Sequence, residues 1–141
     1  MKIKRFEEIE AWQEARKLVN DVYAAINTNE NFKKDFHLTN QIQSAAVSVM
    51  SNIAEGFSRR GNKEFIQFLF ISKSSASEVQ SQLYVALDQK YITGKVFEKM
   101  YDQAEKVAKM NSGFIKYLRS QLNKPNQPNK PNKPNQPPCA A

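Results

Sequence analysis

The stretch of sequence that decides the fold is Phe36–Gly56, which reads FHLTNQIQSAAVSVMSNIAEG. Its apolar residues recur at the three- and four-residue spacing of an α-helix and cover an arc of about 200°, whereas one monomer core needs a stripe of little more than about 100°. From Phe36 to Ala54 there is no formally charged side chain apart from His37. The excess apolar surface predicts a second contact, and we expect another copy of the same chain to supply it.

Three further segments on either side of this stretch have the spacing of amphipathic helices. Together they predict four helices, over 7–27, 36–56, 62–89 and 94–122. All six prolines of the 141-residue chain fall in 125–138, within Lys/Gln-Pro-Asn repeats that hold no apolar residue to bury before Cys139. The sequence therefore predicts an all-α fold with a four-helix domain over 1–123 and a disordered tail over 124–141.

The helix ends and the aromatic residues carry more local expectations. Asn27–Asn31 is expected to be a polar break, and Gly56 is expected to end the second helix in a left-handed conformation. Asn62 and Thr93 are expected to cap the two helices that follow. His37 is expected at the surface. Aromatic side chains at helical core spacing are expected in the core rather than in a base-stacking platform, namely Trp12, Tyr23, Tyr84, Tyr91 and the phenylalanines.

The composition excludes several classes of protein. One cysteine and one histidine allow neither an intramolecular disulfide nor a Cys- or His-based metal site, and no nucleophile–base arrangement indicates an enzyme. We expect no cofactor and no metal. No apolar run approaches membrane-spanning length and the N-terminus is too charged for a signal peptide, so we expect a cytoplasmic protein without a membrane partner. The net charge of +7 permits contact with nucleic acid without requiring it.

A longer pattern joins the second and third predicted helices. It consists of Gln41-Ile42-x-x-Ala45-Ala46-Val47-Ser48, Asn52-Ile53-Ala54-Glu55-Gly56, Arg59 and Phe65-x-x-Phe68-Leu69. With a match over residues 6–120, this pattern closely resembles the 23S rRNA-intervening-sequence protein family of bacteria. The resemblance implies an antiparallel up-down-up-down four-helix bundle that assembles into a ring-like homopentamer. It implies no enzymatic activity. Related proteins are accessory subunits of diversity-generating retroelements, in which a basic pentamer binds a reverse transcriptase and nucleic acid.

Two positions depart from the pattern of that family. Gln43 and Ser44 stand where the family usually has two arginines, which weakens any nucleic-acid contact through the second helix. Met50 lies near a position where the family commonly has a proline, so we expect this helix to run straighter here.

The remaining basic residues give the candidate contacts with nucleic acid. Arg59, Arg60 and Lys63 gather at the corner between the second and third helices, and Lys33 and Lys34 precede the second helix. Such a corner suits a phosphate backbone, and the alternative is an ordinary solvated turn. The lysines of the fourth helix share their face with three acidic residues and indicate a solvated, salt-bridged surface.

The oligomer interface is expected on the second and third helices. The candidate residues are Ala45, Ser48, Val49, Asn52, Phe70 and Ile71. Asn52 and Glu55 are expected to make structural polar contacts rather than to act in acid–base chemistry.

Two functional hypotheses follow. The first is a non-enzymatic, oligomeric scaffold that binds RNA or DNA without sequence preference. The alternative is a protein–protein adaptor that docks a partner enzyme such as a reverse transcriptase. Neither the identity of the partner nor the role of the Pro-Asn tail is predicted.

Overall fold

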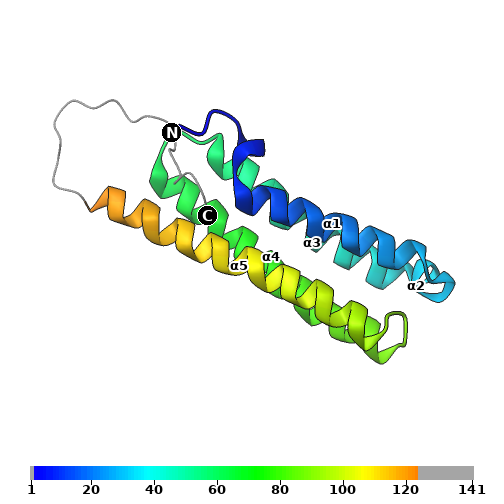
Figure 1. Ribbon diagram of the computed structural model, residues 1–141. Helices are drawn as coiled ribbons and strands as arrows, with labels where there is room; N and C mark the ends of the chain where they lie inside the picture. Colours follow the sequence, from blue (N-terminus) through cyan, green and yellow to red (C-terminus); the bar gives the residue numbers. More distant parts are fainter. Residues whose placement is uncertain (1, 124–141) are drawn as a thin grey trace.

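The computed structural model describes residues 2–123, which are helical without a strand (Figure 1). The predicted tail over 124–141 lies outside the described residues. The elements are a 3₁₀ turn, η1 (Phe6–Glu8), and five helices: α1 (Glu10–Asn27), α2 (Glu30–Lys34), α3 (Phe36–Phe57), α4 (Asn62–Asp88) and α5 (Gly94–Leu122). The four predicted helices correspond to α1, α3, α4 and α5.

The four long helices pack side by side around one core. α3 lies along α4 and α4 along α5, while α1 packs against both α3 and α5 (Figure 1). Each long helix therefore has two long neighbours. Near one end of the bundle, Phe65 of α4 contacts Phe114 of α5 with 4.9 Å between ring centroids. Fully buried side chains from all four helices fill the space between them, among them Leu18, Val49, Leu69 and Leu118.

The first helix begins later than predicted, because Glu7 and Glu8 form the 3₁₀ turn η1. The Glu8 carboxylate accepts hydrogen bonds from the backbone N–H groups of Lys4 (2.7 Å) and Arg5 (3.1 Å). These bonds hold the pKa of Glu8 below its ordinary value. They also satisfy N–H groups at the start of the turn, so α1 proper starts at Glu10.

The predicted polar break at Asn27–Asn31 contains the start of the short helix α2. The Asn29 side chain caps this helix by accepting a hydrogen bond from the Phe32 N–H at 2.9 Å. Phe32 is buried and stacks on Tyr91 with 5.1 Å between ring centroids. A single apolar anchor in a polar run is too short for periodicity to reveal, which is why this helix was not predicted.

Of the three predicted helix-end residues, one is confirmed. Thr93 caps α5, since its hydroxyl accepts a hydrogen bond from the Val96 N–H. The cap predicted at Asn62 is wrong, because Gly61 occupies the N-cap position and Asn62 is the first residue of α4. The prediction that Gly56 ends the helix in a left-handed conformation is also wrong. α3 continues through Gly56 to Phe57, and no glycine of the described residues has a positive φ.

The apolar arc of α3 is covered almost entirely within one chain. Because α3 lies between α1 and α4, two neighbours bury its opposite flanks. Among its large apolar side chains after the first turn, only Val47 is exposed, at 37%. The argument that this helix has apolar surface left over for another copy is therefore wrong for most of its residues.

Candidate nucleic-acid interface

The predicted basic corner forms at the α3–α4 connection. Arg59, Arg60 and Lys63 are all exposed there. Arg59 is held by the chain itself: its Nη2 lies 2.8 Å from Oε1 of Glu55, and its guanidinium lies 4.9 Å from the centroid of the Phe68 ring. Arg60 and Lys63 make no ion pair within residues 2–123, so their charges face solvent.

The start of α4 adds to the attraction of this corner for anions. Gly61 is the N-cap and offers no side chain to the N–H groups of the first helical turn. Such N–H groups, together with the positive end of the helix dipole, favour a bound anion. Glu64 lies in the same turn and opposes this effect in part. The arrangement is suited to holding a phosphate group and presents no acid–base pair.

The structure does not bring Lys33 and Lys34 to this corner. Both lie on α2, immediately before α3, whereas Arg59 and Arg60 follow the end of α3. The 22 residues of α3 separate the two groups by about 33 Å, given a rise of about 1.5 Å per residue. The five candidate basic residues therefore form two surfaces at opposite ends of the bundle.

The six candidate interface residues differ in how much surface they present. Ala45 and Val49 are buried within the single chain, at 3% and 0% exposure, and have no surface for a second copy. Ser48 and Asn52 are half-buried, and the Asn52 amide donates to the Ser48 carbonyl at 2.8 Å. Phe70 and Ile71 are exposed. The exposed apolar side chains among the six are thus on α4, whereas the candidates in the centre of α3 are buried or half-buried.

An open groove runs along the outer side of α3, beside the exposed Tyr23 of α1. It is lined almost wholly by uncharged, mostly small side chains of α3: Asn40, Gln43, Ser44, Val47, Ser48, Ser51 and Asn52. Gln43 and Ser44, the two positions without the family's usual arginines, are among them. This groove therefore carries no cation for a phosphate.

Of the aromatic residues predicted in the core, Tyr23, Tyr84 and Phe36 are instead exposed, and Phe36 is 72% exposed in the first turn of α3. Tyr23 is 41% exposed and Tyr84 is 51% exposed, while Trp12 and Tyr91 pack partly buried against the core. Tyr84 joins a surface cluster with Phe97 and Tyr101, at centroid distances of 4.8 and 6.1 Å. The exposure of Tyr84 could have been predicted from its neighbour Leu83. Leu83 has core spacing, and two adjacent residues on a helix do not share one face.

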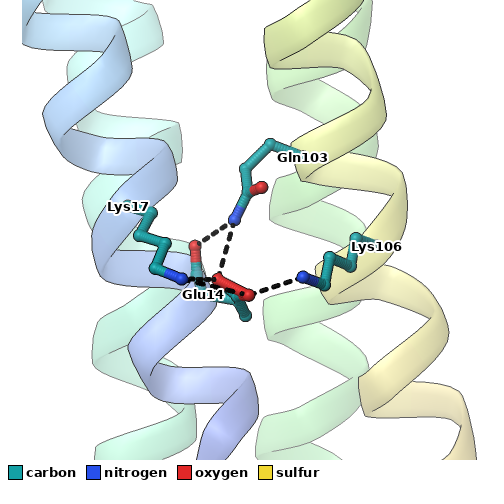
Figure 2. A network of polar contacts seen from close by, with 4 residues as sticks. All are labelled: Glu14, Lys17, Gln103 and Lys106. Carbon is teal, nitrogen blue, oxygen red and sulfur yellow. Dashed lines mark hydrogen bonds and ion pairs between the residues drawn. The ribbon is translucent and has the colours of Figure 1, made fainter.

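The charged face predicted for the fourth helix forms ion pairs, but its lysines pair with α1 rather than with the acidic residues of the helix itself: Lys99 pairs with Asp21 and Lys106 with Glu14. Figure 2 shows Glu14 of α1 between Lys17 and two residues of α5. Its carboxylate lies 2.6 Å from the Lys106 ammonium and 2.9 Å from that of Lys17, and Gln103 donates to it at 3.3 Å. These contacts, that with Lys106 first, lower the pKa of Glu14 to about 2.

The fold and these surfaces define an all-helical bundle protein with a basic corner. Within residues 2–123, no helix has the length and apolar character to cross a membrane. More specifically, the chain belongs to the family described as 23S rRNA-intervening sequence proteins, whose model matches residues 7–113.

A solved structure shares the fold. It is a protein of unknown function from the S23 ribosomal protein family of Bacteroides thetaiotaomicron, and it superposes with a TM-score of 0.71 at 21% sequence identity. The match covers 77% of this chain and 97% of that one. The comparison with curated proteins found no match to the sequence.

Proposed function

We propose that this protein is a non-enzymatic, self-associating helical scaffold that binds nucleic acid without sequence preference. The observation that carries the proposal is the pair of exposed cations, Arg60 and Lys63, at the uncapped start of α4. Contacts of this kind attract the phosphate backbone and do not read bases. The family's association with an intervening sequence of 23S rRNA favours RNA over DNA.

The proposal includes an antiparallel up-down-up-down bundle that assembles into a ring, most simply a homopentamer. Repeating a weak basic corner around a ring multiplies the phosphate contacts without demanding a strong site in each subunit. Exposed Phe70 and Ile71 on α4 offer apolar surface for such an assembly.

Fluorescence anisotropy with short single-stranded RNA and DNA probes of unrelated sequence tests this function. We expect similar affinities for different sequences and a steep fall in affinity as salt rises. The double variant Arg60→Gln/Lys63→Gln should lower the slope of log affinity against log salt by about 1.4 to 1.8. Affinity that does not change between low and physiological salt would contradict the proposal.

A second function, an adaptor for a partner enzyme such as a reverse transcriptase, is favoured by the exposed cluster around Tyr84. Exposed aromatic side chains are enriched among residues that dominate protein–protein binding. A pull-down after nuclease treatment separates the two functions. An enzyme partner that is retained by the wild type and lost by Tyr84→Ala supports the adaptor, and loss of all partners after nuclease treatment supports the nucleic-acid scaffold.

A further inference from the structure

The net charge of residues 2–123 is concentrated at one end of the bundle. Three segments meet there: 2–8 before α1, 55–64 around the α3–α4 connection, and 113–123 at the end of α5 (Figure 1). η1 packs against α3, and α5 contacts α4 through Phe114 and Phe65. We call these three segments the basic end. They hold eight Lys or Arg against four Asp or Glu, whereas the rest of residues 2–123 holds ten of each.

Three of the four carboxylates at the basic end are engaged by the chain itself. Glu55 pairs with Arg59, and Glu7 pairs with Arg5 at 2.8 Å. Glu8 accepts the two backbone N–H groups at the start of η1. These carboxylates therefore do not neutralise the remaining cations, of which five make no ion pair within residues 2–123: Lys4, Arg60, Lys63, Lys116 and Arg119.

Two arginines of the basic end are held against aromatic rings of α4. Arg59 lies over Phe68, and Arg119 lies over Phe70 with 5.3 Å from guanidinium to ring centroid. A guanidinium stacked by its face keeps N–H groups at its edge, where a phosphate oxygen accepts them. Because stacking already restrains the side chain, less conformational entropy is lost on binding.

We propose that the whole basic end, and not the corner of Arg59, Arg60 and Lys63 alone, is the surface that contacts the phosphate backbone. The N-terminal segment contributes Lys4, and the end of α5 contributes Lys116 and Arg119. Nucleic acid then lies across this end of the bundle and leaves the opposite end, with Lys33 and Lys34, outside the contact. The inference rests on the proposed nucleic-acid binding and specifies where that binding takes place.

Two triple variants of the full chain, equal in the charge that they remove, test the location. Lys4→Gln/Lys116→Gln/Arg119→Gln acts at the basic end outside the corner, and Lys33→Gln/Lys34→Gln/Lys95→Gln acts at the opposite end. Each lost phosphate contact should lower the slope of log affinity against log salt by about 0.7 to 0.9. Raising the salt from about 50 to about 200 mM should therefore weaken binding by the first variant about 20- to 40-fold less than it weakens binding by the wild type. The second should keep the wild-type slope.

The outcomes separate the location from the function. If the wild type binds and both triple variants lose slope equally, binding follows net charge and the location is overturned, while the proposed function stands. If the wild type does not bind, the proposed function itself fails. Lysine acetylation with and without RNA gives a second readout that needs no substitution. We expect protection of Lys4, Lys63 and Lys116, and protection of Lys33 and Lys34 instead would overturn the location.

Discussion

A Cβ atom placed on Gly56 would lie 2.7 Å from Cδ1 of Phe65 and 2.8 Å from Cβ of Phe68. Gly56 is buried in the last turn of α3, and Phe65 is a fully buried residue in the first turn of α4. The absence of a side chain at Gly56 is therefore what lets these two helix ends approach. Because Phe65 also contacts Phe114, the same approach positions the end of α5.

The substitution Gly56→Ala should destabilise the protein. Alanine normally stabilises a helix by about 0.5 to 1 kcal/mol relative to glycine, but overpacking a core costs about 1 to 3 kcal/mol. The atoms in the way are a buried ring and a Cβ, so we expect a net loss of about 1 to 2 kcal/mol in the free energy of unfolding. Urea denaturation followed by circular dichroism measures it.

Gly113→Ala is the matched control for this prediction. Gly113 is an exposed interior residue of α5, and an added Cβ meets nothing within 4 Å. The substitution should therefore raise the free energy of unfolding by about 0.5 to 1 kcal/mol. Equal effects of the two substitutions would contradict the role assigned to Gly56.

The substitution Glu14→Gln should remove a stabilisation that depends on pH. Lys106, Lys17 and Gln103 lower the folded-state pKa of Glu14 to about 2 from an ordinary value of 4.5. A carboxylate with a lowered pKa stabilises the fold above its unfolded-state pKa and loses that contribution as the pH falls toward the folded-state value. Because solvent screens both largely exposed lysines, we expect Glu14→Gln to lower the free energy of unfolding by only about 1 to 2 kcal/mol at neutral pH.

Urea denaturation of the wild type and of Glu14→Gln across pH measures this difference. It should be constant above about pH 5.5 and should shrink between about pH 4.5 and 2. A difference that stays constant down to pH 2 would show that Glu14 acts through packing rather than through its charge.

The long helices are predictable from the sequence because their apolar residues recur over many turns. Residues 36–56 and 94–122 correspond closely to α3 and α5. η1 and α2 are not predictable in this way, since each rests on a few local hydrogen bonds and on one anchor, such as Phe32. Gly56 has a glycine's usual place near a helix end, and only the packing of Phe65 reveals its other role.

The candidate site is predictable where its residues are neighbours in the sequence. Arg59, Arg60 and Lys63 share one connection, so their proximity follows directly. The contribution of Lys4 and Arg119 depends on which helix ends meet in three dimensions, and no spacing reveals it. The same limit explains why Ala45 and Val49 were wrongly predicted at the oligomer interface. The width of an apolar arc does not show how much of it two neighbouring helices of the same chain already cover.

A buried hydrogen-bond chain links α3, α4 and α5. The Ser72 hydroxyl donates to the Val49 carbonyl at 2.6 Å and accepts from the Asn111 amide at 2.9 Å. Oδ1 of Asn111 has no partner within residues 2–123. Ser72→Ala should cost about 1 to 3 kcal/mol, because it leaves the buried Asn111 amide group unpaired as well.

Replacing both partners of this chain should cost less than replacing Ser72 alone. The double variant Ser72→Ala/Asn111→Leu fills the same space without a buried polar group. A double-mutant cycle by urea denaturation measures the coupling of Ser72 and Asn111, which we expect at about 1 kcal/mol or more. Additive effects would show that the two side chains contribute independently.

The self-association of the chain depends on the exposed part of α4 in the proposed function, and Ile71→Glu should disrupt it. Ile71 is 48% exposed, so the substitution is compatible with the fold of one chain, whereas an interface there would bury a carboxylate without a partner. We expect the oligomer to dissociate at concentrations about tenfold higher than the wild type, as measured by sedimentation velocity and native mass spectrometry. Val96→Glu, at an exposed site on the first turn of α5, is the control and should assemble normally. A wild type that stays monomeric at high concentration in dilute buffer would remove the ring and, with it, the multivalent binding.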